Sequence, residues 1–513
     1  MSPARRMMDS GARQQLRSQA GPPPRGASEH ESPGRQGLPL TGSDAARSAS
    51  PFSSLKLPLL SPAPGITSLW PASSARLLLA LLPGPPRDAA MTEDKACGLG
   101  LWREIEDAAG KCRRPVCVTG RLAEFDPVTG EVIRVVDTSQ LPGGRIEVPC
   151  GNRREQVCPP CSRLYKGDTF QVMIAGLAGG RGIPETVAAH PAVFVTLTAP
   201  GFGLVHRGPG RDGIPVPCRP RRDRPACEHG QSASCGRRHA GGEQVIGQPF
   251  CFECFDYAEA VLFNASVPAL WDQQVQAVRA QLAADTGLSQ RGLRRYVRLS
   301  FGKVAEYQER GLVHVHAVIR LDGPDGPGDP APPWADADLL RQSVLAAAGI
   351  PAVRVPRPDG SGSMLTLSWG AQADARVVRR EIDGELDGRM VAAYVAKYAT
   401  KGTEAIGGIP VPVRSPADLD DWNVTPHVRR LIIACWQLGQ RPEYQDLRLA
   451  RWAHQLGYRG HFSTRSRRYS VTLASRRAER QQARAAWSRE QAGLPAQPGI
   501  ISAEWHYAGQ SGP

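Results

Sequence analysis

Two histidines separated by one residue, His314 and His316, lie inside an apolar stretch whose alternation is typical of a β-strand. Side chains two residues apart on a strand point to the same face, so the two imidazoles project together. A metal ion needs at least one more ligand, and the preceding stretch offers Glu306, with Gln308 or Glu309 as alternatives. Such a set leaves coordination positions open, which suits a divalent ion that polarises a phosphate. A purely structural role for the pair is the competing interpretation.

A second pattern combines phenols with ammonium groups. Tyr394, Lys397, Tyr398 and Lys401 form two Tyr-x-x-Lys pairs offset by four residues. On a helix, positions four apart share one face, so the two tyrosines are neighbours and so are the two lysines. A phenol is a poor nucleophile at neutral pH, but nearby ammonium groups favour the phenolate and also neutralise a phosphodiester. The alternative is an amphipathic helix whose tyrosines cap a core.

The chain has twelve cysteines, and two Cys-x-x-Cys pairs divide most of them into two groups. We predict two structural Zn²⁺ sites, with a redox role for each pair as the alternative. The first site comprises Cys112, Cys150, Cys158 and Cys161, with Cys117 competing with Cys112. The second comprises Cys227, Cys235, Cys251 and Cys254, with Cys218, His229 and His239 as substitutes. Cys97 and Cys435 are expected to be plain thiols.

A third motif places these patterns in an order. Phe194-Val-Thr-Leu-Thr198 reads as a short apolar strand ahead of the His-x-His strand and the Tyr-x-x-Lys helix. This order resembles the three motifs of the HUH endonucleases, and the doubled tyrosine resembles their two-tyrosine subclass. Strings such as Cys158-Pro-Pro-Cys-Ser-Arg-Leu-Tyr-Lys-Gly167, Tyr257-Ala-Glu-Ala-Val-Leu-Phe-Asn264 and Arg310-Gly-Leu-Val-His-Val-His316 are similar to rolling-circle replication initiators of actinobacterial plasmids and integrative elements. The similarity covers roughly residues 95–475.

The resemblance implies an α+β fold: a five-stranded antiparallel sheet with packed helices, the His pair on a central strand and the tyrosine helix packed across it. His314 and His316, with Glu306, would bind Mg²⁺ or Mn²⁺. Tyr398 or Tyr394 would attack the scissile phosphate, leaving a 5′-phosphotyrosyl link and a 3′-OH that primes rolling-circle replication. Some initiators carry a carboxylate four residues before the nucleophile, where this chain has Tyr394, so Tyr398 ranks first.

Two other functions fit the same residues. A two-tyrosine transposase or relaxase would use the same chemistry with a different outcome. A zinc-stabilised, non-enzymatic DNA-binding regulator would use the His and Tyr residues only structurally.

The elements that must position these residues follow from periodicity. A hairpin is predicted from strands at 297–307 and 312–321, and further strands at 132–136 and 193–198. Helices are predicted at 267–290, 335–348, 389–401 and 425–457, followed by an Arg-rich helix that ends near Gln491.

Composition suggests five regions. Residues 1–90 hold 14 Pro, 8 Gly and 14 Ser without an apolar period, so we predict a disordered extension, and Met91 is a candidate for the true start. A Cys-rich zinc-binding region at 91–260 overlaps a nicking domain at 190–415 that begins with the first nuclease strand. A basic helical region at 420–490 and a flexible tail at 491–513 complete the chain.

The net charge of +14 favours an anionic partner, nucleic acid first. Residues 421–513 carry fourteen basic and six acidic side chains, so DNA contacts are predicted there. Aromatic side chains interleaved with arginine suit phosphate contact and base stacking, and the residues selected are Arg459, Arg465, Arg467, Arg468 and Tyr469. No nucleotide-binding Gly-Lys-Ser/Thr loop is found, so unwinding is expected from supercoiling or from a host helicase, and synthesis from a host polymerase. No apolar run is long enough to span a membrane, and a cytoplasmic protein is expected.

Overall fold

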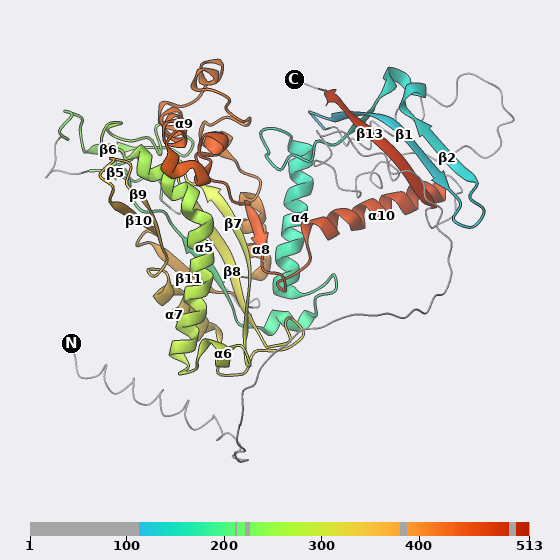
Figure 1. Cartoon of the computed structure of the whole chain (residues 1–513). Helices are drawn as coiled ribbons and strands as arrows, with labels where there is room; N and C mark the ends of the chain where they lie inside the picture. The colour runs from blue at the N-terminus through green and yellow to red at the C-terminus, as the bar shows by residue number, and fades with distance from the viewer. Residues whose placement is uncertain (1–111, 211–212, 221–225, 380–386, 492–498, 512–513) are drawn as a thin grey trace, which may run out of the picture. The chain divides into compact units, whose positions relative to one another are not determined.

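The computed structural model describes residues 112–210, 213–220, 226–379, 387–491 and 499–511 (Figure 1). The chain divides into two units, Met1–Ser74 and Ala75–Pro513, and all described residues belong to the second. The predicted disorder of residues 1–90 and the thiol Cys97 therefore lie outside the described residues.

The sheet that carries the candidate chemistry has five antiparallel strands in the order β11-β4-β8-β7-β12. The strands are β4 (Ala192–Leu197), β7 (Arg298–Tyr307), β8 (Val313–Asp322), β11 (Ala373–Val377) and β12 (Ser463–Arg465). The hairpin of β7 and β8 pairs Glu306 with His314 and Val304 with His316. The predicted hairpin is therefore present, and the two histidines lie on the middle strand.

The two faces of this sheet are covered by different helices, because alternate side chains point to opposite faces. Val313, Val315 and Ala317 of β8 face a large apolar core with α5 (Tyr257–Asp285) and α7 (Ala337–Ala347). Val318 and Val304 face a smaller core with α4 (Pro159–Ala178) and α8 (Gly388–Tyr398). His314 and His316 share the face of this smaller core, so the α8 side of the sheet carries the site (Figure 1).

The helices predicted at 267–290, 335–348 and 389–401 and the Arg-rich helix are present over most of their length, whereas the helix predicted at 425–457 is not. The remaining α-helices are α6 (Gln290–Leu293), α9 (Pro426–Gly439) and α10 (Leu473–Gln491). The predicted helix at 425–457 stops at Gly439 and continues as two 3₁₀ segments, η6 (Pro442–Leu447) and η7 (Ala450–Gln455). Pro442 is the reason, since proline lacks the N–H that a continuing α-helix needs.

The basic C-terminal region is not purely helical. Its β12 forms the edge of the central sheet by pairing with β7, so the sheet uses residues well beyond position 415. A further correction concerns the tail at 491–513, which was expected to be flexible. Residues Ile500–Gln510 form β13, which pairs antiparallel with β1 (Val116–Phe125) along most of its length (Figure 1).

β13 belongs to a separate four-stranded sheet with β1, β2 (Val132–Asp137) and β3 (Ile146–Val148). Two shorter hairpins are formed by β5 (Pro217–Arg219) with β6 (Cys235–Arg238), and by β9 (Ala352–Pro356) with β10 (Met364–Ser368). In the part of the chain that is described, no helix is long and apolar enough to cross a membrane.

Candidate active site and metal centres

Glu306, His314 and His316 converge at the β7–β8 register. His314 Nε2 lies 3.1 Å and His316 Nε2 lies 3.3 Å from the same oxygen, Oε2 of Glu306. The other carboxylate oxygen of Glu306 accepts a hydrogen bond from Lys401 Nζ at 3.2 Å. The hairpin register produces this cluster, because Glu306 pairs directly with His314 and His316 is two residues further along the same face.

The charges at this site suit a cation ligand set. Burial raises the pKa of Glu306, but hydrogen bonds from His314 and His316 and the Lys401 charge outweigh it, so that pKa falls to about 2. Burial lowers the pKa of His316, although its contact with Glu306 acts in the opposite direction. The carboxylate is therefore ionised and His316 neutral at neutral pH, which are the states that bind a metal.

The donor atoms fit a divalent ion. His316 Nε2 is buried, and the polar atom that it faces is Oε2 of Glu306. The three ligand atoms all lie within 4.8 Å of one another. An octahedral ion with ligands at about 2.1 Å sets neighbouring donors about 3 Å apart, close to the distances seen here. Glu306 is the carboxylate of this group, whereas Glu309 is exposed and Gln308 lines the neighbouring cleft.

The two tyrosines of α8 lie over this cluster. The Tyr394 and Tyr398 ring centroids are 4.5 Å apart, and those of Tyr394 and His316 are 5.1 Å apart. Tyr398 lies 5.6 Å from His316. Val391, Ala392, Val395 and Ala396 bury the opposite stripe of the helix against the sheet. The 3.6-residue period thus turns both phenols to the histidines.

The two lysines differ in position. Lys401 Nζ lies 4.5 Å from the Tyr398 ring centroid while it bonds Glu306, so it connects the tyrosine helix to the carboxylate. Lys397 is exposed, with its ammonium 5.8 Å from the same ring. The two histidines and the two tyrosines line a cleft of about 1010 Å³ together with residues of β4 and β11.

Two side chains of β4, Thr196 and Phe194, contact His316, although the sequence predicted an individual role for neither. Thr196 Oγ1 lies 3.0 Å from His316 Nδ1, which leaves Nε2 to face Glu306. Phe194 stacks on the His316 ring at 5.7 Å and touches Tyr394 edge-on at 5.6 Å. The signal for them was the Phe-x-Thr-Leu-Thr motif itself, whose alternate residues share one face. Their partner on β8 follows from the β4–β8 register, in which Thr196 pairs with His316.

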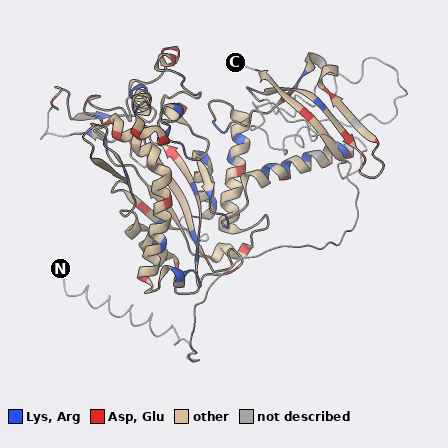
Figure 2. Ribbon diagram, viewed as in Figure 1, with Lys and Arg blue, Asp and Glu red and all other residues tan. Residues whose placement is uncertain are grey.

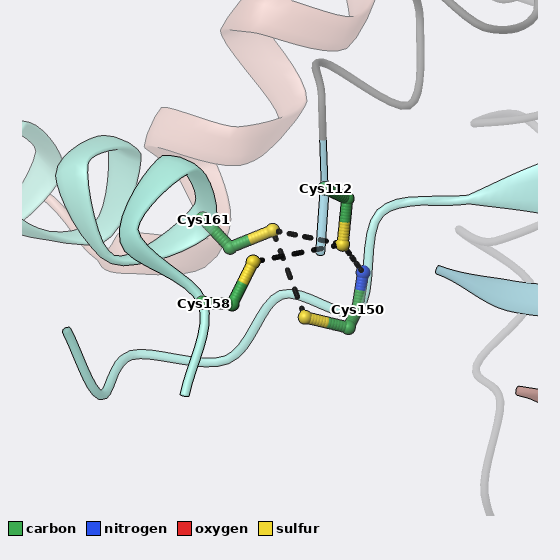
Figure 3. A group of neighbouring side chains, drawn as sticks. All are labelled: Cys112, Cys150, Cys158 and Cys161. Atoms are coloured by element: carbon green, nitrogen blue, oxygen red, sulfur yellow. Dashed lines mark hydrogen bonds between the residues drawn. The ribbon is translucent and has the colours of Figure 1, made fainter. Parts of the chain in front are cut away.

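Cys112, Cys150, Cys158 and Cys161 form a compact group of four thiols (Figure 3). The sulfur–sulfur distances are 3.6 Å for Cys112–Cys158, 3.8 Å for Cys150–Cys161 and 3.7 Å for Cys112–Cys161. Zinc with Zn–S bonds of 2.3 Å in a tetrahedron requires sulfurs about 3.8 Å apart, and a disulfide requires about 2.05 Å. The geometry therefore fits a Cys₄ zinc ion. Cys117 lies elsewhere, beside Ser511 and Glu147.

The loop of this Cys₄ group holds the end of the tyrosine helix. Arg153 NH1 donates to the carbonyls of Ala399 at 3.1 Å and Lys401 at 2.6 Å. Arg154 pairs with Glu404 at 2.9 Å. Cys158 and Cys161 also begin α4, which packs along α8. The cysteine group is thus connected to the position of Lys401.

The second predicted cysteine group requires a correction. Cys227, Cys251 and Cys254 do lie together, but their fourth neighbour is His229, with Nδ1 at 3.2 Å from Cys254 Sγ. Cys235 belongs to a different group. The reason is the β5–β6 hairpin, which pairs Cys235 with Arg219 and so brings it beside Cys218.

Tyr469, predicted to stack on DNA bases, is fully buried. Its hydroxyl donates to the Met173 carbonyl, and its ring packs in the core between α4 and the sheet, so it cannot meet a base. Arg465 donates to the carbonyls of Ser466 and Arg467, and Arg459 donates to that of Asp446.

Arg467 and Arg468 line a basic pocket of about 350 Å³. Three further arginines from α5, α6–β7 and β7 complete it, namely Arg279, Arg294 and Arg298, and its lining contains no carboxylate. Arginines also recur along α10 (Figure 2). There, however, Arg480 pairs with Asp168 and Arg489 with Glu124. The five-arginine pocket, which has no carboxylate in its lining, is therefore better suited to bind an anion than α10, where two arginines already pair with carboxylates.

Residues 98–512 match a protein family described as "Replication initiator protein, pSAM2" (RepSA). A curated replication initiator protein from Streptomyces ambofaciens is 42% identical over 418 residues, which cover 80% of this chain and 86% of that relative. No solved structure matches the chain. Together with the cleft described above, these matches lead to one conclusion: the chain belongs to the family of replication initiator proteins typified by that of pSAM2.

Proposed function

We propose that this protein initiates rolling-circle replication by nicking one DNA strand through tyrosine attack and later rejoining it. The observation that carries the proposal is the convergence of two tyrosines on a two-histidine, one-carboxylate group in a single cleft. Membership in a replication initiator family supports DNA as the substrate. The five antiparallel strands with the His pair in the middle agree with the resemblance to HUH endonucleases.

Glu306, His314 and His316 would hold Mg²⁺ or Mn²⁺, which would draw electron density from the scissile phosphate and offset its charge. The Tyr398 oxygen forms a bond to phosphorus while the bond from phosphorus to the 3′ oxygen breaks. The phenol proton passes to solvent, and the departing 3′ oxygen gains a proton to become the 3′-OH primer. Lys401 favours this exchange because its ammonium lies beside both the Tyr398 ring and Glu306.

The second tyrosine allows the displaced strand to be rejoined after one round of synthesis. Tyr394 lies against Tyr398 and His316, so a new strand end can reach it without leaving the cleft. After one round of synthesis Tyr394 accepts the regenerated 5′ phosphate, and the free 3′-OH then attacks the first phosphotyrosine and closes the circle. Each transfer conserves the number of phosphodiester bonds, so no nucleotide hydrolysis is needed.

The five-arginine pocket is a second DNA contact in this proposal. Arg298 and Glu306 lie eight residues apart on β7, which corresponds to about 26 Å at 3.3 Å per residue. A strand nicked at the cleft thus has a basic pocket within reach of its flanking nucleotides. Arg467 and Arg468 carry this role.

The test is an oligonucleotide that carries the cognate origin, incubated with Mg²⁺ or Mn²⁺ and analysed for a covalent protein–DNA adduct. We expect an adduct in the unaltered protein, a strong reduction in Tyr398→Phe and none in Tyr394→Phe/Tyr398→Phe. Tyr507→Phe is the matched control, since this exposed tyrosine lies on β13, away from the cleft. Tight binding without an adduct in either metal would refute nicking and favour a DNA-binding regulator.

A further inference from the structure

Between β4 and α5 the structure brings together four metal-binding side chains that the cysteine motifs alone did not group. They are His206, Cys218, Cys235 and His239, and their donor atoms all lie within 4.8 Å of one another. We propose that these residues bind a third structural zinc ion, which holds two arginines at the end of the nicking cleft.

The distances agree with tetrahedral coordination. His206 Nδ1 lies 3.7 Å from Cys218 Sγ, and His239 Nε2 lies 3.6 Å from Cys235 Sγ. A zinc ion with Zn–N near 2.05 Å and Zn–S near 2.3 Å sets nitrogen and sulfur about 3.6 Å apart. The donors are mostly shielded, since Cys218 and His239 are buried. Two thiolates and two imidazoles are a ligand set that selects zinc.

The neighbours of these ligands orient them. Glu243 Oε2 lies 2.8 Å from Nδ1 of His239, so that nitrogen carries the proton and Nε2 is left with its lone pair toward the group. The backbone N–H of Arg207 donates to Cys218 Sγ at 3.2 Å. The His206 ring packs on Phe250 at 4.2 Å, which fixes its plane. A carboxylate behind a histidine and an amide donating to a thiolate are the outer contacts that metal ligands normally have.

The order of the ligands along the chain interlocks two sites. His206 and Cys218 come first, then Cys227 and His229 of the neighbouring group, then Cys235 and His239, and finally Cys251 and Cys254. Each ion would therefore bridge a segment that encloses ligands of the other. In residues 206–210, 213–220 and 226–254, the strands are the short β5 and β6, and such a segment has too little core to fix its shape. Two crossed metal ions supply that stability instead.

The zinc ion would fix the positions of two positive charges, because Arg207 directly follows the ligand His206 and Arg219 directly follows the ligand Cys218. With Arg310 they line a pocket of about 470 Å³, which shares Thr198, Gln308 and Gln372 with the catalytic cleft. Arg310 donates to the carbonyls of Ala199 and Pro200, and Arg207 donates to that of Pro217.

The charge of these arginines is not neutralised within the described residues, where none of the three pairs with a carboxylate. Burial and the Arg219 charge lower the pKa of Arg310 to about 10, which indicates two crowded cations. A phosphate of a DNA strand leaving the cleft relieves that repulsion. This second half of the inference rests on the proposed nicking function.

The zinc site is tested first on the unaltered full chain, by elemental analysis and zinc X-ray absorption. We expect three zinc ions per chain with a mean shell of three sulfurs and one nitrogen, because the three groups supply nine cysteines and three histidines. Two ions per chain with a mean near 3.5 sulfurs would overturn the proposal.

Variants assign the third ion. Cys218→Ser and His239→Ala should each lose one zinc ion per chain, whereas Cys435→Ser, a buried thiol outside all the groups, should keep three. Loss of a zinc ion in Cys435→Ser, or full zinc content in both ligand variants, would contradict the assignment.

The arginine contact is tested by binding alone, so its outcome is independent of whether nicking occurs. A Tyr394→Phe/Tyr398→Phe background binds a single-stranded origin oligonucleotide over a range of salt concentrations. Arg207→Gln/Arg219→Gln should weaken binding about tenfold and reduce the salt slope by about 1.4, since each phosphate contact on a single strand contributes about 0.7. Arg163→Gln, an exposed arginine of α4, is the control. Unchanged affinity and slope would refute the phosphate contact while leaving the nicking proposal standing.

Discussion

Replacing Arg153 with methionine should loosen the end of the tyrosine helix without touching any residue of the cleft. The Arg153 guanidinium donates to two carbonyls just beyond α8, those of Ala399 and Lys401, and lies 3.6 Å from the Phe462 ring. Methionine keeps most of the apolar contact with Phe462 but removes the charge and both donors. The variant therefore isolates the link between the Cys₄ loop and Lys401.

The magnitude follows from these two contacts. A hydrogen bond from a charged group contributes about 1.5–3 kcal/mol, and a cation at a helix C-terminus about 0.3–1 kcal/mol. In the variant, water forms hydrogen bonds with the freed carbonyls and replaces part of this stabilisation. The variant also no longer buries a charge. We therefore expect a net local loss of about 2–3 kcal/mol. That corresponds to a roughly 30- to 150-fold rise in the opening equilibrium of the helix end.

The assay is native-state hydrogen exchange at the backbone amides of residues 397–401, combined with the nicking rate. Exchange at these amides should accelerate by that factor, and nicking should slow by about 10- to 100-fold because Lys401 and Tyr398 lose their fixed positions. Arg163→Met, on the exposed side of α4, should change neither. If exchange in Arg153→Met matches that of the control, the Cys₄ loop does not support the helix and the reasoning is wrong.

Three further predictions concern the ligand set, the core and pH. Glu306→Gln should weaken Mn²⁺ binding by more than about 100-fold in an isothermal titration, whereas Glu309→Gln, its exposed neighbour, should bind normally; equal affinities would remove Glu306 from the site. Tyr469→Phe should cost about 1 kcal/mol of unfolding free energy for the lost bond to Met173 yet leave DNA affinity unchanged, and a tenfold weaker affinity would contradict its burial. Asp322 is fully buried and forms hydrogen bonds with His190, Ser300 and Arg320. Burial raises the pKa of Asp322, but these three partners outweigh burial, so the pKa is lowered overall. Because the folded pKa is lowered, the stabilisation is present above about pH 4 and is lost as pH falls through the folded value. Asp322→Asn should therefore lose about 3–5 kcal/mol at pH 7, and this difference should shrink toward pH 3 in denaturant unfolding; a constant difference would refute the ionised pair.

Local patterns were enough to predict the elements that carry the site. Alternation along 313–322 placed His314 and His316 on one face, and the 3.6-residue period of 388–398 placed Tyr394 and Tyr398 together. Both are properties of backbone geometry within one element, so sequence spacing determines them. The hairpin itself also followed from sequence, but the choice of Glu306 over Gln308 and Glu309 came from the strand register, which pairs Glu306 with His314.

Contacts between elements could not be read in the same way. Spacing grouped Cys235 with Cys227, Cys251 and Cys254, but the pairing of β5 with β6 carries it to Cys218 instead. Tyr469 lies among arginines in sequence, which suggested DNA contact, yet its chain segment turns the ring into the core beside Gly302 and Met173. Thr196 acquires its role only when β4 pairs with β8.

The sequence by itself therefore indicated the candidate groups: two imidazoles on one strand, two phenols on one helix and two Cys-x-x-Cys pairs, each set by spacing within a few residues. Tertiary structure alone decided which Cys and His residues share an ion, which arginines face a cleft and that residues 500–510 pair with β1. The physical reason is that helix and strand periods act within a few residues. Ligand sets and charged pockets depend on packing between segments tens to hundreds of residues apart, whose distances no local period encodes.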